Sequence, residues 1–267
     1  MPNNLENIRA LVIDVDGVLW HGKQALPGVP AFFDFLSKHE IAFVIATNNS
    51  ARPASDITFR LGRMGVNIDD DKVLTSAEAT ARALPRIAPN VKRVFVVGGE
   101  GLVAALKQSG YEIVDHDADA VIAGLDLALS YEKLKRASFE IRQGAKFIGT
   151  NGDKTFPLEE GVAPGAGAIL AAIQTATDVA PIVIGKPERA MFDIAIEKMH
   201  ATRETTAMLG DRLDTDIDGA HRAGLKSILV MTGVTTPATL RAAQSTIKPD
   251  WAFENLTALL DEWARAY

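Results

Sequence analysis

The sequence contains no cysteine, and this absence excludes several kinds of chemistry at once. Without cysteine there can be no disulfide bond, no thiolate metal site and no cysteine nucleophile. The sequence also lacks an apolar run long enough to cross a membrane. Its first ten residues, MPNNLENIRA, are polar and lack the apolar core of a signal peptide. A cytoplasmic location is therefore the simplest expectation.

An excess of positive charge is missing as well. The 267 residues include 28 Lys and Arg against 34 Asp and Glu, which gives a formal net charge of −6. The chain therefore lacks the basic footprint that is typical of proteins that bind nucleic acid. Its 47% hydrophobic and 23% charged residues are ordinary for a globular protein, and its length predicts a sizeable core and two domains.

Short apolar runs alternate with amphipathic stretches along the whole chain, which predicts an α/β fold with a mainly parallel sheet. We expect strands at Ala10–Ile13, Ala42–Ala46, Arg93–Val97, Ala120–Ala123, Lys146–Ile148, Pro181–Ile184, Ala207–Leu209 and Ser227–Val230. Clear helical patterns cover Val29–Lys38, Tyr131–Gln143 and Arg189–Met199. A further helix is bounded by Pro53 near its start and Gly65 after its last turn.

Polar motifs follow four of the expected strands, where parallel sheets bind their ligands. The motifs are DVDG at 14–17, TNNS at 47–50, GKP at 185–187 and GDRLDTDID at 210–218. The first and last supply carboxylates, the second a hydroxyl and amides, and the third a cation. A fifth candidate, VVGGEGL at 96–102, lacks the spacing of a dinucleotide-binding loop, so we expect an ordinary turn between a strand and a helix.

Asp14 and Asp16 stand two positions apart in extended chain, so they should face one space, and Gly17 lets the chain turn away. Two adjacent carboxylates repel each other, and a hard cation such as Mg²⁺ would relieve that repulsion. The alternative is a pair of solvated acids in a turn. Asp211, directly after its strand, is the best further metal ligand, whereas Asp214 and Asp218 share a helix face that could be plainly solvated.

The TNNS and GKP motifs suit an anion. Thr47 and the amides around it precede a helix, whose N-terminus favours phosphate, although helix capping alone would also explain these residues. Pro187 suits the first position of a helix, so Lys186 would stand at the positive end of a helix dipole. A cation is disfavoured there unless an anion is bound beside it. The alternative is a lysine that extends into solvent.

Together these motifs resemble those of the haloacid dehalogenase (HAD) superfamily of phosphohydrolases. DVDGV resembles its first motif, Thr47 of ATNNS its second, Lys186 of GKP its third and GDRLDTD its fourth. The residues of these motifs are similar to those of the NagD or p-nitrophenylphosphatase-like branch, subclass IIA. The resemblance implies a Rossmann-like core at residues 1–76 and 182–267, interrupted by an α/β cap of the C2 type at residues 77–181.

The resemblance also implies a mechanism. Asp14 would attack phosphorus and form an aspartyl-phosphate, and Asp16 would act as general acid and then general base. The Asp14 carboxylate, the Asp16 carbonyl and Asp211 would bind Mg²⁺ directly. Asp216 would support the metal site from the outer coordination shell. The phosphoryl group would be held by Thr47, Asn48 and Lys186. The enzyme would then be a Mg²⁺-dependent phosphomonoesterase acting on a small phosphorylated metabolite.

Two other functions use similar groups. A phosphotransferase or mutase would form the same aspartyl-phosphate, and a signalling receiver also combines strand-end acids with Thr and Lys. The second acid at Asp16 and the long inserted segment argue against a receiver. Enzymes of the family that this sequence resembles act on nucleotides, sugar phosphates, phosphoglycolate and pyridoxal phosphate. The resemblance is also compatible with a homodimer.

The four motifs contain nothing that could recognise a leaving group, so we expect selectivity to come from the cap. The segment at 149–169 is dense in Gly and Pro, follows an apolar run, and predicts a loop. Its Asn151 and Asp153 are candidate contacts to the substrate. The alternative is a surface turn in which both side chains bond their own backbone.

Overall fold

The computed structural model describes residues 5–158, 161–243 and 247–265. The chain divides into two compact units. The first unit comprises Met1–Ala46, Ile57–Val73 and Lys186–Tyr267, and the second comprises Thr47–Asp56 and Leu74–Gly185. In the described residues, no helix combines the length and the apolar character that a membrane span requires.

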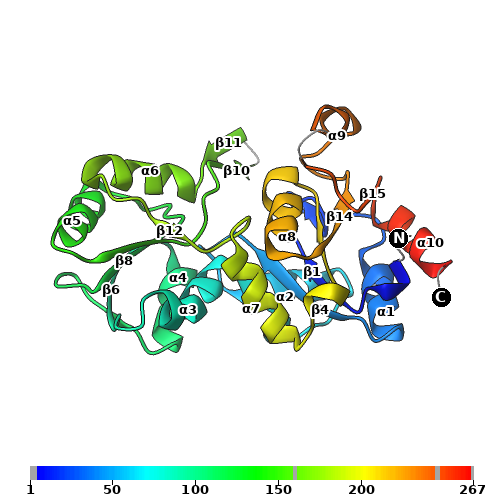
Figure 1. Ribbon diagram of the computed structural model, residues 1–267, viewed down its shortest axis with the longest axis horizontal. Coiled ribbons are helices and arrows are strands. Elements are labelled where there is room, and N and C mark those ends of the chain that lie inside the picture. The colour runs from blue at the N-terminus through cyan, green and yellow to red at the C-terminus, as the bar shows by residue number, and fades with distance from the viewer. Residues whose placement is uncertain (1–4, 159–160, 244–246, 266–267) are drawn as a thin grey trace. The chain divides into compact units, whose positions relative to one another are not determined.

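A six-stranded sheet forms the centre of the first unit (Figure 1). Its order is β15 (Trp251–Phe253), β14 (Lys226–Val230), β13 (Thr206–Gly210), β1 (Ala10–Ile13), β4 (Ala42–Thr47) and β5 (Val73–Thr75). Strand β1 pairs in parallel with both β13 and β4, with Ile13 opposite Leu209 and Ile45. All four β1 residues are buried, as expected for a strand covered on both faces. The carboxyl ends of β1, β13 and β4 therefore lie at one edge.

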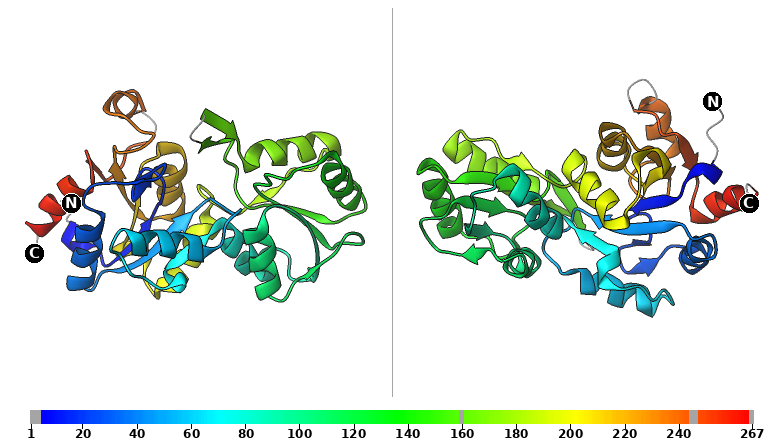
Figure 2. Two further views of the ribbon diagram at one scale, coloured as in Figure 1. Left: turned by 180° about the vertical axis from the view of Figure 1, so that it is seen from behind. Right: turned by 60° about the horizontal axis from the view of Figure 1, so that its bottom comes forward.

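Helices cover this sheet. Helices α7 (Arg189–Met199) and α8 (Asp218–Ala223) pack together, and so do α1 (Val29–Lys38) and α10 (Leu256–Ala264), the blue and red helices near the termini in Figure 2. Phe35 of α1 contacts the ring of Trp263 of α10. The remaining elements are α2 (Ala54–Arg63), α9 (Pro237–Ala243), the short hairpin β2 (Trp20–His21) and β3 (Gln24–Ala25), the 3₁₀ turns η1 (Leu5–Asn7), η2 (Asp70–Lys72) and η3 (Arg203–Thr205), and the π-helical turn η4 (Leu213–Ile217).

The second unit has its own parallel sheet. Its order is β12 (Ile182–Val183), β9 (Lys146–Gly149), β8 (Ala120–Ala123), β6 (Arg93–Val97) and β7 (Glu112–Ile113). Helices α5 (Tyr131–Arg142) and α6 (Ala166–Thr177) lie on one face, and α3 (Ser76–Ile87) and α4 (Glu100–Gln108) on the other (Figure 1). Thr75 and Ser130 cap α3 and α5 by accepting hydrogen bonds from the backbone N–H groups of Glu78 and Lys133.

The predicted α/β fold is confirmed, and each of the eight expected strands is present. The segment VVGGEGL is the expected turn between β6 and α4. There a side chain at Gly101 would lie 2.6 Å from the backbone of Arg52, so the glycine permits close contact between two backbones.

The predicted loop at 149–169 is partly wrong, because it contains an antiparallel hairpin of β10 (Thr155–Leu158) and β11 (Gly161–Pro164). Proline is tolerated there because both strands are edge strands. Residues 159–160 of that segment lie outside the described residues.

Candidate active site

The loop after β1 is shaped by Gly17. Its φ of +83° lies in the left-handed region, and an added Cβ would stand 2.6 Å from Cγ of Asp211. The chain then folds back, with the N–H of Gly17 donating to the carbonyl of Trp20 at 2.7 Å and that of Leu19 to Val15 at 2.9 Å. This tight turn brings the loop against Asp211 at the end of the neighbouring strand β13.

Three carboxylates meet at this edge of the first unit. Asp14 follows β1, Asp211 follows β13 and Asp216 comes from η4, and an oxygen of each lies within 4.8 Å of the others. All three are buried, Asp216 completely. The Nζ of Lys186, which is only 3% exposed, lies 2.5 Å from Asp14 Oδ1 and 2.8 Å from Asp216 Oδ1. Residues that are far apart in the sequence thus form one buried ionic cluster.

Burial and mutual repulsion dominate the electrostatics of this cluster. Burial, followed by the charges of Asp216 and Asp14, raises the pKa of Asp211 to about 8. Burial also raises the pKa of Asp216 to about 6 and raises that of Asp14, although Lys186 opposes both shifts. Burial would lower the pKa of Lys186, but Asp14 and Asp216 outweigh it and raise that pKa. Three carboxylates therefore share one ammonium, which cannot neutralise them all.

Asp211 carries the feature that fits a metal ion. Its Oδ2 accepts a hydrogen bond from the N–H of Val234 at 2.6 Å, but its Oδ1 is buried and has no hydrogen-bond partner among the described residues. A buried carboxylate oxygen without a partner is costly. A hard divalent cation, which prefers oxygen ligands, would satisfy that oxygen and reduce the repulsion. The donor set of the cluster therefore fits such a cation.

Asp16 has different surroundings. Its side chain is exposed, and Oδ1 accepts a hydrogen bond from Nε1 of Trp20 at 2.9 Å. The partial removal of water around this loop raises the pKa of Asp16, whereas the Trp20 hydrogen bond and the charge of Arg60 oppose the rise. Asp16 is thus held beside the cluster by a neutral donor.

The other predicted site residues belong to the second unit. Thr47 is buried at the end of β4, and its Oγ1 accepts a hydrogen bond from the N–H of Asn49 at 3.1 Å. The Nδ2 of Asn48 donates to both carboxylate oxygens of Asp153 at 3.1 Å, and the carbonyl of Asn48 accepts from Nδ2 of Asn151 at 2.7 Å. The structure therefore joins Asn48, Asn151 and Asp153 in one network.

One expectation about Lys186 is wrong. Helix α7 begins at Arg189 with Glu188 as its N-cap, so Pro187 does not occupy the first helical position. Lys186 lies before the cap, and its charge is balanced by carboxylates. It does not extend into solvent either.

Sequence reasoning missed Trp20, the N–H of Val234 and the bond between Asn48 and Asp153. Only Trp20, four residues after Asp16, carried a local signal in the sequence. Asp214 is exposed and pairs with Arg212, as the solvated alternative predicted, whereas Asp218 is only partly exposed and pairs with Arg222.

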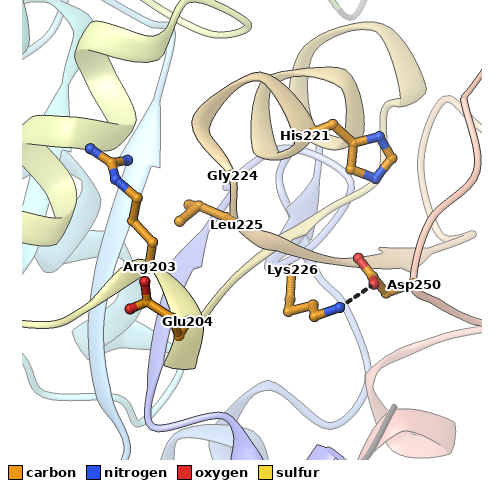
Figure 3. Close-up of a pocket in the computed structure, with 7 residues that line it drawn as sticks. All are labelled: Arg203, Glu204, His221, Gly224, Leu225, Lys226 and Asp250. Carbon is orange, nitrogen blue, oxygen red and sulfur yellow. Dashed lines mark hydrogen bonds and ion pairs between the residues drawn. The ribbon is translucent and has the colours of Figure 1, made fainter. Parts of the chain in front are cut away.

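A surface pocket of about 380 Å³ lies elsewhere in the first unit (Figure 3). It is lined by Arg203, Glu204, His221, Gly224, Leu225, Lys226 and Asp250, which precede or begin β13, β14 and β15, or lie on α8. The pocket therefore stands at the amino ends of these strands, opposite to the acid cluster. Lys226 and Asp250 pair with each other at 2.9 Å, and Asp250 also fixes the buried Ser227. These groups hold β14 and β15 in register.

Comparisons with known proteins identify the family of this chain. Residues 11–112 match the family model described as haloacid dehalogenase-like hydrolase, and residues 183–259 match one described as HAD-hydrolase-like. The acid sugar phosphatase of Staphylococcus saprophyticus is 36% identical over 259 residues, which cover 97% of this chain and 99% of the relative.

Two solved structures are similar over nearly their whole length. The 4-nitrophenylphosphatase of Thermotoga maritima is 38% identical with a TM-score of 0.91, covering 96% of this chain and 98% of that one. NagD from Escherichia coli K-12 is 32% identical with a TM-score of 0.86, covering 93% and 97%. The chain therefore belongs to the haloacid dehalogenase-like hydrolases, in their NagD-like branch, and is an enzyme of the HAD phosphatase type.

Proposed function

We propose that the protein is a Mg²⁺-dependent phosphomonoesterase that hydrolyses a small phosphorylated metabolite through a phosphorylated Asp14. The observation that carries this proposal is the buried trio of Asp14, Asp211 and Asp216, whose charge exceeds that of Lys186 and whose Asp211 Oδ1 has no hydrogen-bond partner in the described residues. Because similar proteins are named acid sugar phosphatase and 4-nitrophenylphosphatase, sugar phosphates are the first class to test.

The metal would be held by the Asp14 carboxylate, the Asp16 carbonyl and the Asp211 carboxylate. When bound, Mg²⁺ would offset negative charge on the phosphoryl oxygens. Asp216 suits a supporting role because both of its oxygens already accept hydrogen bonds, Oδ1 from Lys186 and Oδ2 from the N–H of Arg212 at 3.1 Å. Asp211 has one oxygen, Oδ1, that no group in the described residues binds, and it therefore suits direct ligation.

The chemistry would run through the two acids of the β1 loop. Asp14 attacks phosphorus, the bond to the leaving oxygen breaks with its electron pair, and Asp16 gives that oxygen a proton. The Asp16 carboxylate then takes a proton from the water that attacks the phosphorylated Asp14, and this step releases phosphate. Lys186 keeps Asp14 oriented through its bond to Oδ1.

Thr47, Asn48 and Lys186 would bind the phosphoryl group, whose three oxygens need cationic and neutral donors. The inserted segment at 77–181 would act as the cap that selects the leaving group, with Asn151 and Asp153 as its candidate contacts. The core motifs offer only phosphate and metal ligands, which supports the inserted segment as the source of contacts to the leaving group.

The test is a turnover assay with 4-nitrophenyl phosphate and a panel of sugar phosphates, with and without Mg²⁺. We expect stoichiometric release of inorganic phosphate, and a radiolabel on Asp14 after an acid quench with ³²P-labelled substrate. Transfer of the label to an added alcohol in place of water would favour a phosphotransferase. A stable label without turnover would favour a signalling receiver, and no label with full turnover would contradict Asp14 as the nucleophile.

A further inference from the structure

The indole of Trp20 is directed at the carboxylate of Asp16. Trp20 is 4% exposed, whereas the side chain of Asp16 is exposed, and the two are joined by the 2.9 Å bond from Nε1 to Oδ1. The loop folds back so that Trp20 also lies beside Asp16 through a backbone bridge. An exposed carboxylate does not need such a donor for its own solvation. The bond therefore restricts a side chain that would otherwise rotate.

Arg60 holds the indole from its other side. Its guanidinium carbon lies 4.0 Å from the centre of the Trp20 ring, which is the geometry of a cation–π contact. The Nη2 of Arg60 also donates to the carbonyl of Gly22, in the turn between β2 and β3. One side chain from helix α2 thus fixes both the ring of Trp20 and the backbone that follows it. The result is a chain of contacts from Arg60 through Trp20 to Asp16.

We propose that Trp20 is a positioning residue for Asp16 and that Arg60 supports it. This inference rests on the proposed role of Asp16 as general acid and base. An indole N–H can only donate, so the oxygen it binds must be an acceptor. The carbonyl oxygen of a carboxylic acid accepts a hydrogen bond better than its hydroxyl oxygen does, so the bond to Oδ1 favours the proton of Asp16 on Oδ2. Trp20 thereby decides which oxygen of Asp16 gives its proton to the leaving group.

A purely structural role is the competing explanation. Buried tryptophans usually find a partner for their N–H, and the Trp20 ring also fills space in the core. Phenylalanine would keep most of that packing and remove only the donor. A positioning role predicts a loss that depends on the leaving group, because poor leaving groups need the proton most. A packing role predicts an equal loss with all esters.

The experiment compares Trp20→Phe with Trp263→Phe. Trp263 is a matched control because it is completely buried in the same unit and its Nε1 has no hydrogen-bond partner among the described residues. With glycerol phosphate, an alkyl ester, we expect Trp20→Phe to lower kcat by about 10- to 100-fold, part of what a general acid contributes. With 4-nitrophenyl phosphate the loss should be about threefold or less. Trp263→Phe should change both substrates equally. Equal losses in Trp20→Phe would overturn the proposal.

Arg60 supplies a graded variant. Arg60→Ala should reproduce the dependence on the leaving group with a smaller amplitude, and Arg60→Lys should partly restore the alkyl ester because it keeps a cation above the ring. Arg63→Ala, on the same helix, is the control and should leave the ratio of the two substrates unchanged. An Arg60→Ala enzyme with the wild-type ratio would remove Arg60 from the proposal.

A readout without turnover separates this inference from the proposed function. The indole N–H resonance of Trp20 should move upfield in Asp16→Ala, because it loses an acceptor, while that of Trp263 stays in place. An unmoved Trp20 resonance would show that the bond is not made in solution and would overturn the inference even in an active phosphatase. A moved resonance in a protein that hydrolyses no phosphate ester would instead refute the proposed function, and the catalytic meaning of the bond with it.

Discussion

Each unit buries a cluster of polar groups just after the end of a parallel strand. The two clusters differ in how far the hydrogen-bond donors and acceptors of the described residues pair with one another. In the second unit, Asn151 donates to Asn48 and Thr150 and accepts from the N–H of Asp153, so its donors and acceptors pair off. In the first unit, Asp14, Asp211 and Asp216 can only accept when ionised. Among the described residues, Lys186 is the cation that pairs with Asp14 and Asp216, and the remaining donors are backbone N–H groups.

This difference between the two clusters indicates which of them requires a bound ligand. Amides and hydroxyls carry both donors and acceptors, so a network built mainly of amides can be completed by the protein itself, even where it includes the carboxylate of Asp153. A group of carboxylates needs more positive charge than one lysine offers. The buried Oδ1 of Asp211 shows this, because it has no hydrogen-bond partner among the described residues. We therefore expect the acid cluster to depend on a bound cation and the amide network to depend only on its own geometry.

The largest effect should follow from removing the nucleophile. Asp14→Asn keeps the shape of the side chain but is a poor nucleophile, so turnover should fall by at least about 1,000-fold. The matched control is Asp126→Asn in the second unit, where a buried carboxylate also pairs with a lysine, Lys133, at 2.6 Å. The control should lose stability and keep its activity. Residual activity of Asp14→Asn within tenfold of wild type would contradict the assignment.

Removal of the metal should be nearly as severe. Treatment with a chelator should reduce turnover more than about 100-fold, and Mg²⁺ should restore it, whereas Ca²⁺ should substitute poorly because it prefers larger, looser coordination. Mg²⁺ at 100 times its Kd should also stabilise the fold by about 2.7 kcal/mol, visible as a higher Tm. Asp211→Asn should abolish that shift in Tm. Full activity in metal-free buffer would reject the site.

Without metal, the acid cluster should make stability depend on pH. The folded-state pKa values of Asp211, about 8, and Asp216, about 6, lie above the ordinary value of 3.8. Between these values the folded protein keeps protons that the unfolded chain has lost, so the contribution of the acid cluster to stability is greatest at low pH and declines as pH rises toward 8. The decline should be on the order of 1 kcal/mol per pH unit for each such proton.

Denaturant titrations in chelator at several pH values measure this decline. Asp211→Asn provides the comparison, because it removes the group with the higher pKa and should flatten the slope between pH 6 and 8. Saturating Mg²⁺ should flatten it too, since the metal binds the ionised carboxylates. Stability of the wild type that rises over this interval in chelator would contradict the cluster as described.

The acid cluster was largely predictable from the sequence because local rules place its members. Apolar runs locate β1 and β13, adjacent parallel strands end at one edge, and Asp14 and Asp211 directly follow them. Pairing of Lys186 with Asp14 and Asp216 could not be predicted, because it joins residues far apart in the chain. The helix-dipole argument for Lys186 failed because α7 begins at Arg189, so Lys186 lies before the N-cap, and the carboxylates of Asp14 and Asp216 determine its environment.

The amide network was hidden from sequence analysis. Asn48 and Asp153 stand 105 positions apart and meet only when both loops are folded, and no local pattern links them. The hairpin of β10 and β11 was missed because its glycine and proline content is also typical of loops. Short two-residue strands such as β2 and β7 are likewise too short to produce a periodic signal.

Breaking the amide network should affect stability before chemistry. Asn151 is 3% exposed, and Asn151→Ala removes its side-chain hydrogen bonds and leaves the carbonyl of Asn48 with one donor fewer. We expect a loss of about 2 to 3 kcal/mol, measured by denaturant titration. Asn49→Ala, at an exposed neighbour whose side chain accepts a local hydrogen bond from the N–H of Ala51, should cost about 1 kcal/mol or less. A loss for Asn151→Ala no larger than for this control would contradict a structural role.

The smallest effect concerns Asp153, and it decides between two roles for this residue. Its carboxylate is partly exposed and binds the amide of Asn48, which follows Thr47, so it could fix the phosphate-binding loop or could contact the substrate. Asp153→Ala should change kcat/KM by about three- to tenfold, the value of one or two hydrogen bonds. If Asp153 only fixes Asn48, KM should rise equally for 4-nitrophenyl phosphate and for the best sugar phosphate. If it contacts the leaving group, the ratio of kcat/KM for the two substrates must change.

A second variant, Asp153→Asn, distinguishes the two roles further, because it keeps one acceptor for Asn48 but removes the charge. Recovery of both substrates in Asp153→Asn would assign Asp153 to the loop, whereas a persistent loss for the sugar phosphate alone would assign it to substrate selection.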